Sequence, residues 1–515
     1  MSIRALLDAR VEDDSVALLA GPLTLTWRQY VAASRGRVAA LAGLLDASRP
    51  LHVGVLLDNT PEMAIQLAAA GWGAHVLVGL NTTRRGDGLL ADIRRADCQV
   101  IVTDAAHAEL LAPLALDDVT VLDASYAWPE DGPAPGAAPR GESLFMLIFT
   151  SGTSGEPKAV RITHEKITFP GAYLTERLGL SSEDVHYVSM PLFHSNAVVA
   201  GWAPALCNGA TIALAERFSA SGFLDDVRRY GATYANYVGK PLAYVMATPE
   251  RPDDAENPLR IVFGNEGNER DIAAFGERFG CRVVDGFGST ENAVVISRIE
   301  GTPPGSLGQP APGVAVFSPE TGRECPVATY DAAGAVTNLE ECVGELVNTT
   351  GTGQFAGYYN DEAATAERMR GGMYWSGDLA YRDADGWVYY AGRTADWLRV
   401  DGENLAAAPI ERILLRHPAI SEAAVYAVPD PRSGDQLVAA LVLTGSLTAT
   451  GLGDFLADQQ DLSTKAWPRY VRVLDVLPRT ATNKVLKREL QAGPQEATWT
   501  REERGRTYSA HGGRH

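Results

Sequence analysis

The sequence has few cysteines, and they are too scattered to form a framework. The five are Cys98, Cys207, Cys281, Cys325 and Cys342, and no two of them make a Cys-x-x-Cys pair. This pattern indicates neither a disulfide-rich secreted domain nor a structural zinc site. We therefore expect buried free thiols.

Long apolar runs are also missing. No stretch reaches the ~20 apolar residues that a transmembrane helix needs, so we expect no membrane-spanning segment. The first ten residues carry charge and lack a long apolar core, unlike a secretory signal peptide. Together with free thiols, these features predict a cytoplasmic protein.

Basic residues are fewer than acidic residues. Lysine and arginine number 45 against 64 aspartates and glutamates, which gives a net charge of −19. Such a balance disfavours nucleic acid or an anionic membrane surface as the main partner and leaves small molecules as the expected substrates. At 515 residues the chain is too long for a single core, so two or more domains are expected.

The common phosphate-binding P-loop is absent, but another glycine-rich loop is present. The only Gly-Lys pair, Gly239-Lys240, is followed by proline instead of serine or threonine. Six apolar residues from Leu144 to Phe149, typical of a strand buried on both faces, run into Thr150-Ser-Gly-Thr-Ser-Gly-Glu-Pro-Lys158. Glycines let consecutive N–H groups point at one anion, and the hydroxyls and the lysine add donors. The stretch predicts a polyphosphate site, although a polar surface turn can have this composition too.

The rest of the chain alternates between helical and strand-like segments. A helical pattern from Thr26 to about Leu45 precedes strand-like runs at 52–57, 76–80, 99–103, 185–190, 210–214, 234–238 and 261–263. This alternation predicts a layered α/β domain. From Thr394 the pattern changes to a small α+β unit, with a helix at 408–416 and strands at 422–428 and 437–443. The residues after about 497 are polar and charged, and we expect this tail, with His511 and His515, to be disordered.

Two motifs stand where strands are expected to end. They are Gly264-Asn-Glu-Gly267 and Asp285-Gly-Phe-Gly-Ser-Thr-Glu291. Ligands of α/β sheets collect beyond the carboxyl ends of strands. Phe287 offers an aromatic face for adenine, Thr290 a hydroxyl near a phosphate, and Glu291 a carboxylate for Mg²⁺. Taken alone, the second motif could be a simple turn with an exposed glutamate.

These motifs resemble those of the adenylate-forming superfamily, which includes acyl-CoA synthetases, luciferases and non-ribosomal adenylation domains. The glycine-rich loop resembles the family's phosphate loop, Gly286–Glu291 its second signature, and Leu477-Pro-Arg-Thr-Ala-Thr-Asn-Lys484-Val its third. The resemblance runs from about Leu25 to Leu490. It is strongest to the mycobacterial fatty-acid–CoA-ligase-like and fatty-acid-transport-protein-like branch.

The resemblance implies a domain organisation. A large N-terminal AMP-binding domain of layered α/β subdomains would span 1–393, a small mobile α+β domain carrying a catalytic lysine would span 394–497, and the tail would span 498–515. The segments 344–347 and 358–361 resemble a β-rich part of the large domain. We expect no built-in carrier domain, as in a stand-alone enzyme.

The resemblance also implies roles for individual residues. Lys484, Glu291, Thr150 and His194 would be catalytic, although a lone histidine after a strand is more often structural. Thr150 and Glu291 would bind Mg²⁺, and the substrate pocket would include His194, Val238, Gly264, Gly288 and Asn292. The residues expected to bind ATP are Thr150, Ser151, Gly152, Thr153, Ser154, Gly155, Lys158, Gly264, Asn265, Glu266, Asp285, Gly286, Phe287, Gly288, Thr290, Asp378, Arg393 and Lys484.

The implied reaction has two halves. A carboxylate attacks the α-phosphate of ATP to give an acyl-adenylate and pyrophosphate, and the thiol of coenzyme A then displaces AMP. Lys484 would serve the first half, after which the small domain would turn and bring the face with Asp401 and Gly402 to the thiol channel.

Two alternatives remain open. Some relatives of this branch activate nitrite with ATP and transfer it to an aromatic amine, as diazotases of natural-product pathways. Asn292-Ala293, where glycines are common, would suit such a small polar substrate. A non-catalytic nucleotide-binding homologue is the other alternative, and the presence of Lys158, Glu291, Asp378, Arg393 and Lys484 argues against it.

Overall fold

The computed structural model describes residues 1–151, 157–267, 269–332, 334–393, 397–400, 403–430, 434–459, 461–462, 464–479, 485–501 and 505–510. Its contacts divide the chain into two compact units. Unit 1 comprises Met1–Ala293 and Thr352–Glu367, and unit 2 comprises Val294–Gly351 and Arg368–His515. Most of the segment from Val294 to Arg393 groups with the C-terminal part, and the domain boundary expected at 393 stays a prediction.

Unit 1 contains a six-stranded sheet that carries the glycine-rich loop. Its strands, in the order β6-β5-β3-β4-β7-β8, are β6 (Thr120–Asp123), β5 (Cys98–Thr103), β3 (His52–Leu56), β4 (Val76–Gly79), β7 (Leu144–Ser151) and β8 (Pro157–Thr163). All neighbours are parallel except β7 and β8. As predicted, β7 is buried on both faces from Phe145 to Phe149. Thr150 lies opposite Lys158, so the glycine-rich loop joins two adjacent antiparallel strands.

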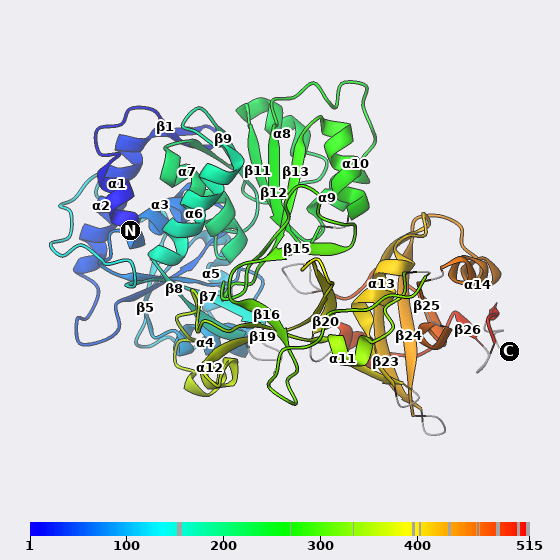
Figure 1. Ribbon diagram of the computed structural model, residues 1–515. Helices are drawn as coiled ribbons and strands as arrows, with labels where there is room; N and C mark the ends of the chain where they lie inside the picture. Colours follow the sequence, from blue (N-terminus) through cyan, green and yellow to red (C-terminus); the bar gives the residue numbers. More distant parts are fainter. Residues whose placement is uncertain are drawn as a thin grey trace. The chain divides into compact units, whose positions relative to one another are not determined.

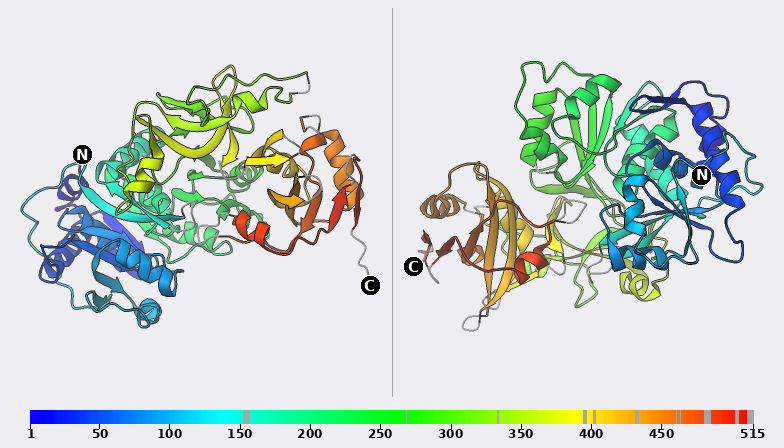
Figure 2. Two further views of the ribbon diagram at one scale, coloured as in Figure 1. Left: turned by 90° about the horizontal axis from the view of Figure 1, so that it is seen from below. Right: turned by 180° about the vertical axis from the view of Figure 1, so that it is seen from behind.

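The other strands of unit 1 are part of a larger, 14-stranded sheet and hold both turn motifs. Their order is β13-β12-β11-β9-β10-β1-β2, formed by β13 (Arg282–Phe287), β12 (Ile261–Asn265), β11 (Tyr234–Val238), β9 (Val185–Val188), β10 (Thr211–Leu214), β1 (Val16–Ala20) and β2 (Leu23–Thr26). Figures 1 and 2 show β11, β12 and β13 (green) side by side. These three strands are parallel, with Val238 opposite Asn265 and Asn265 opposite Gly286. Their carboxyl ends therefore meet at one edge.

Two helices of unit 1 begin at threonine caps. Thr26 caps α2 (Trp27–Ala42) with a capping box, and Thr60 caps α3 (Pro61–Gly71), whose first turn contains the proline. The π-helix η1 (Ala197–Trp202) directly follows His194, Ser195 and Asn196. The remaining helices are α1 (Ile3–Asp8), α4 (Gly86–Arg95), α5 (Ala105–Leu111), α6 (Glu165–Leu178), α7 (Ala203–Asn208), α8 (Phe223–Tyr230), α9 (Pro241–Met246), α10 (Glu269–Phe279) and α12 (Glu362–Arg368). The layered α/β prediction is confirmed.

Unit 2 begins with antiparallel strands. Their order is β16-β17-β19-β20-β15-β14, from β16 (Val314–Phe317), β17 (Gly344–Asn348), β19 (Met373–Arg382), β20 (Val388–Arg393), β15 (Ser306–Pro310) and β14 (Ile296–Ser297), with β18 (Met369–Arg370) beside β19 and α11 (Leu339–Cys342) before β17. The hairpin of β21 (Trp397–Val400) and β22 (Glu403–Ala406) follows.

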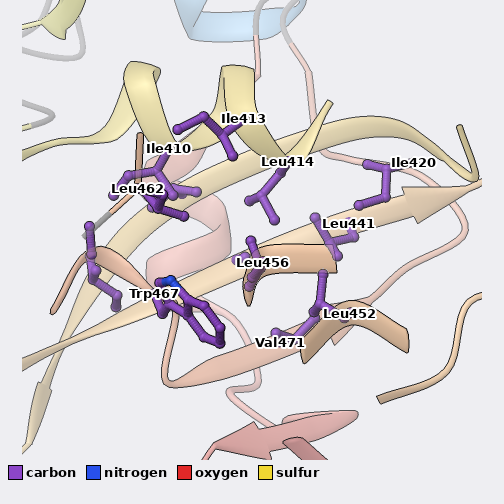
Figure 3. Packing of buried hydrophobic residues seen from close by; sticks show 14 of the residues in the cluster. Ile410, Ile413, Leu414, Ile420, Leu441, Leu452, Leu456, Leu462, Trp467 and Val471 are labelled. Carbon is purple, nitrogen blue, oxygen red and sulfur yellow. The ribbon is translucent and has the colours of Figure 1, made fainter. Parts of the chain in front are cut away.

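The end of unit 2 is the predicted small α+β arrangement. A five-stranded sheet runs β23 (Ile420–Asp430), β24 (Gly434–Leu443), β25 (Tyr470–Val473), β26 (Trp499–Arg501) and β27 (Tyr508–Ala510). Helices α13 (Ala407–Leu414) and α14 (Ala449–Asp458) and Trp467 pack on the face that carries Val425 and Leu441 (Figure 3). The opposite face, with Tyr426 and Val438, packs on Leu477 and on Leu490 of α15 (Lys487–Ala492). Alternate strand residues thus build two cores.

The expectation of a disordered tail is wrong for its strands. Trp499 in β26 is 7% exposed and Tyr508 in β27 is 2% exposed, and the Tyr508 hydroxyl donates to the Pro468 carbonyl at 2.6 Å. These two aromatic side chains are buried, although the segment around them is polar. The average composition of the segment therefore did not indicate ordered strands. His511 and His515 lie outside the described residues.

The cysteines carry free thiols, as expected, and Cys98, Cys325 and Cys342 are buried. Burial raises the pKa of Cys342 to about 12. This thiol is therefore protonated at neutral pH. Among the helices of the described segments, none has both the length and the apolar character needed to cross a membrane.

Three buried histidines should make unit 1 sensitive to acid. Burial lowers the pKa of His75, His164 and His186 from 6.5 to about 4. Between these values the unfolded chain binds more protons than the folded one, so the free energy of unfolding should fall as pH drops through this window. Urea-unfolding midpoints measured across it check this, and His75→Phe should lessen the decline. A midpoint that stayed constant from about pH 6.5 to 4 would contradict the expectation.

Candidate active site

The glycine-rich loop is described at its two strand ends. Gly152, Thr153, Ser154 and Gly155 lie outside the described residues, as does Lys484, and the side chain of Ser151 is likewise undescribed. Thr150 is half-buried at the end of β7, opposite Lys158 in β8. Lys158 is 7% exposed, and its Nζ lies 3.7 Å from Glu367 Oε2 and 5.3 Å from the centre of the Tyr358 ring. The base of the loop therefore holds a nearly buried cation.

Tyr358 connects this cation to the predicted metal-binding carboxylate. Its hydroxyl donates to Glu291 Oε1 at 2.8 Å, and Lys158 lies over its ring. The resemblance assigned the segment 358–361 to a β-rich part of the large domain. The structure groups Thr352–Glu367 with unit 1, where Tyr358 forms a β-bridge with Val160. Tyr358 is therefore a site residue that the sequence interpretation missed.

Amide side chains link the turn motifs at the sheet edge. Asn265 Nδ2 donates to the Gly286 carbonyl at 2.8 Å, which joins the ends of β12 and β13. Asn196 Nδ2 donates to the Tyr237 carbonyl at 2.9 Å and to Asn265 Oδ1 at 3.3 Å. The residues before η1 therefore belong to the same network, and Ser195 Oγ lies 3.0 Å from Thr290 Oγ1.

Two predicted ligand residues also have structural partners. The Tyr237 hydroxyl and the Gly267 N–H both donate to Asp285 Oδ2, at 2.6 and 3.0 Å. A side chain at Gly264 would overlap the Tyr237 ring, so β12 needs glycine there for packing. These contacts explain Asp285 and Gly264 without a ligand, and their roles toward nucleotide and substrate stay predictions.

The predicted pocket residues come from several segments of unit 1. Val238 ends β11, and Gly288 follows β13 at a point where an added Cβ would meet no atom within 4 Å. The His194 ring lies 4.6 Å from the Phe193 ring. Asn292 has a left-handed backbone, with φ of 52°, and its Nδ2 donates to Gln354 Oε1. The Asn292 amide is therefore engaged by another side chain.

Lys166 is a second residue that the sequence interpretation missed. It lies in the first turn of α6, is 2% exposed, and its Nζ has no hydrogen-bond acceptor among the described residues. Burial lowers the pKa of Lys166 to about 7, while the negative charge of Glu291 acts to raise it. Helical periodicity in the sequence does not single out this lysine, because it sits among ordinary helix residues.

In unit 2, the predicted ribose-binding residues face each other. Asp378 in β19 lies opposite Arg393 in β20, and Arg393 Nε lies 3.4 Å from Asp378 Oδ1. The preceding Gly377 has φ of 77°, which favours glycine, and its N–H donates to Glu345 Oε1 at 2.6 Å. The turn before Asp378 is thus held in a fixed conformation.

Comparisons with known proteins agree with this arrangement. The chain is 55% identical over 91% of its length, and 91% of the relative's, to the "Medium/long-chain-fatty-acid--CoA ligase FadD17" of Mycobacterium marinum. It is 45% identical to the "Steroid-22-oyl-CoA synthetase" of Rhodococcus jostii, over 95% of this chain and 90% of that protein. The o-succinylbenzoate coenzyme A synthetase of Bacillus subtilis, solved with ATP and magnesium ion, has a TM-score of 0.78 at 25% identity and covers 95% of this chain and 98% of its own.

Family models match both parts of the chain. The model of the AMP-binding enzyme matches residues 7–359, and that of the AMP-binding enzyme C-terminal domain matches residues 409–484. The first match alone spans more than half of the chain. The chain belongs to the family of AMP-binding enzymes.

Proposed function

We propose that the chain is an ATP-dependent, AMP-forming ligase that activates a carboxylic acid as acyl-AMP and transfers the acyl group to coenzyme A. The observation that carries the proposal is the connection from Lys158 through Tyr358 to Glu291. It joins the cation of the glycine-rich loop to the carboxylate of the second motif, as a site for a nucleotide with its metal requires.

In the first half-reaction, an oxygen of the acid attacks the α-phosphorus and pyrophosphate leaves. Negative charge gathers on the phosphate oxygens, and fixed positive charge stabilises it most effectively where water is excluded. Lys158 supplies such a charge from a nearly buried position. In the second half, the thiol sulfur attacks the acyl carbon and AMP leaves with the oxygen that came from the acid.

Glu291 and Thr150 would hold Mg²⁺. Carboxylate and hydroxyl oxygens suit this ion, which usually keeps several waters and binds through one or two protein ligands and the substrate phosphates. Among the described side chains, no three acidic, histidine or cysteine groups cluster as an all-protein metal site, which agrees with such shared coordination. The bound ion would neutralise phosphate charge, and the hydrogen bond from Tyr358 would orient Glu291 for this purpose.

The relatives favour an apolar acid as the substrate. Two of them are named for medium- or long-chain fatty acids and for a steroid acid. They support neither nitrite activation nor a non-catalytic role, and the hydrogen bond from Asn292 to Gln354 gives the Asn292 amide an internal partner.

Product analysis tests the proposal. The full chain is incubated with ATP, Mg²⁺, coenzyme A and a panel of fatty and steroid acids, and acyl-CoA, AMP and pyrophosphate are measured; parallel samples contain nitrite and arylamines. We expect acid-dependent AMP and pyrophosphate in equal amounts with acyl-CoA. AMP formation only with nitrite and amine, or none with any substrate, would overturn the proposal.

Asp378→Asn should weaken ATP binding more than catalysis. The neutral amide loses a charged acceptor for the ribose hydroxyls and the attraction to Arg393, so we expect the KM for ATP to rise about tenfold with kcat changed far less. Glu324→Gln is the matched control, because Glu324 makes an exposed ion pair with Arg382 on the same strand, at 2.8 Å. An ATP KM that rose equally in both variants would refute the ribose assignment.

A further inference from the structure

Three asparagine side chains of unit 1 form a chain of hydrogen bonds that leads to the second motif. Asn236 Nδ2 donates to Asn196 Oδ1 at 2.7 Å, and Asn196 Nδ2 donates to Asn265 Oδ1 at 3.3 Å. Asn265 Nδ2 in turn donates to the Gly286 carbonyl at 2.8 Å. The asparagine chain therefore runs from β11, through the residue before η1, to the ends of β12 and β13.

Two backbone carbonyls fix the direction of these hydrogen bonds. A carbonyl oxygen only accepts, so Asn265 has to turn its NH2 group toward Gly286. For the same reason Asn196 has to turn its NH2 group toward the Tyr237 carbonyl, which it reaches at 2.9 Å. The Oδ1 atoms of these two asparagines then face their donors, Asn196 and Asn236. A reversed amide at Asn196 would place its oxygen against two other oxygens.

The asparagine chain begins in the core. Asn236 is 3% exposed, and its Oδ1 finds no hydrogen-bond partner among the described residues. Burial of a polar group with an unpartnered oxygen is unfavourable, so packing by itself does not favour asparagine at this position. The hydrogen bond that Asn236 donates to Asn196 is what this side chain contributes.

The residue before Asn196 contacts the other end of the second motif. Ser195 Oγ lies 3.0 Å from Thr290 Oγ1. Two consecutive residues therefore hold the motif near both of its ends, Asn196 through the asparagine chain at Gly286 and Ser195 directly at Thr290. The sequence places the adenine-stacking residue, Phe287, beside the first end and a phosphate beside the second.

We propose that Asn196 is a positioning residue for the adenine end of the nucleotide site and that it acts through Asn265. The asparagine chain holds the ends of β12 and β13 together, so that the base meets a preformed surface and binding does not have to order the two turns. Ser195 positions the phosphate end in the same way. The inference rests on the proposed function for the identity of the nucleotide.

Binding of two ligands to the full chain tests the proposal. The Kd values of AMP and of adenosine, which differ only in the phosphate, are measured by isothermal titration calorimetry for wild type and Asn196→Asp. Aspartate keeps the shape of asparagine, but its carboxylate cannot donate to Tyr237 or Asn265. We expect both Kd values to rise by the same factor, about tenfold, the scale of one or two hydrogen bonds. A loss confined to AMP, or no loss, would overturn the proposal.

Ser195→Ala should give the opposite selectivity. It removes the contact with Thr290, so the Kd of AMP should rise about threefold to tenfold while that of adenosine stays within about twofold of wild type. An equal loss with both ligands would contradict the separation of the two ends.

Asn208→Asp is the matched control. Asn208 is the last residue of α7, and its Oδ1 accepts from the Ala210 N–H at 2.9 Å, a contact that aspartate retains. Its Nδ2 has no hydrogen-bond partner in the described part of the chain, so the exchange removes no donated bond there. Both Kd values should stay within about twofold of wild type. Asn196→Ala removes the amide without adding charge and should match Asn196→Asp, also if the aspartate variant does not fold.

A double variant tests the route through Asn265. Asn265→Ala removes the same connection, so adding Asn196→Ala to it should change the Kd of adenosine less than about twofold. A further loss as large as that in the wild-type background would refute this route. A melting temperature that falls in Asn196→Asp while both Kd values stay at the wild-type level would mark the asparagine chain as structural only.

The outcomes distinguish this inference from the ligase proposal. If wild type binds AMP but releases no pyrophosphate with any acid, the ligase function fails, and the binding test of Asn196 still stands because it needs no acid. If wild type releases pyrophosphate and the Asn196 variants bind both ligands as wild type does, only the role of Asn196 is refuted. If wild type binds neither ligand, both fail.

Discussion

Lys484→Ala is expected to lower ATP-dependent pyrophosphate release about a hundredfold to a thousandfold, the scale for loss of one group that stabilises transition-state charge. The expectation comes from the third signature, Leu477–Val485, because Lys484 itself lies outside the described residues. In the implied mechanism this lysine acts in the first half-reaction alone. A supplied acyl-adenylate should therefore still be converted to acyl-CoA at near the wild-type rate.

Lys487→Ala is the matched control for this experiment. Lys487 lies three residues further on, at the start of α15, and its Nζ is 2.8 Å from Glu411 Oε1 in an ion pair within unit 2. Its loss should leave pyrophosphate release within about twofold of wild type, since partly exposed ion pairs contribute little. Equal damage to both half-reactions in Lys484→Ala would contradict the assignment of this lysine to adenylation.

Glu291→Gln should cause the second large loss, about tenfold to a hundredfold in turnover. The amide is a poorer ligand for Mg²⁺ and a weaker acceptor for the Tyr358 hydroxyl, which now donates to Glu291 at 2.8 Å. Raised Mg²⁺ should restore part of the activity. Turnover measured over a series of Mg²⁺ concentrations checks this, and a loss that Mg²⁺ does not relieve would argue against metal binding by Glu291.

A comparison with the neighbouring Tyr359 tests whether the Tyr358 hydroxyl acts through Glu291. Tyr358→Phe removes the hydrogen bond to Glu291 and should shift the Mg²⁺ requirement upward, less than Glu291→Gln does. Tyr359→Phe removes the adjacent hydroxyl, which donates to Asp97 at 2.9 Å, and should leave the requirement unchanged. In the double variant of Tyr358 and Glu291 the two effects should not add, because both act on one contact.

The elements of the fold follow from local patterns, and the sequence predicts most of them. The apolar run before the glycine-rich loop forms β7, and the helical pattern that begins at Thr26 forms α2, with Thr26 as its cap. The ordered strands at Trp499 and Tyr508 were not predicted, because the composition of the C-terminal segment is polar on average and only these two aromatic residues are buried in the core. The grouping of Thr352–Glu367 with unit 1 depends on pairing between distant segments, which no local pattern encodes.

The sequence likewise predicts some residues of the candidate site and misses others. Motifs identified Glu291, Asp378 and Arg393, and the last two prove to be a facing pair. Tyr358 and Lys166 escaped notice because their significance arises only in three dimensions: Tyr358 meets a carboxylate 67 residues away in sequence, and Lys166 is unusual only for its burial. Hydrogen bonds from Asn196 and Tyr237 that hold the turn motifs are invisible in sequence for the same reason.

The central claim is that an acid oxygen attacks the α-phosphorus of ATP, and isotope transfer tests it most directly. The protein is supplied with a fatty acid labelled with ¹⁸O in both carboxylate oxygens, together with unlabelled ATP and coenzyme A, and the products are analysed by mass spectrometry. The account predicts one ¹⁸O in each AMP, one in the acyl-CoA and none in pyrophosphate. Unlabelled AMP, or label in pyrophosphate, would contradict it.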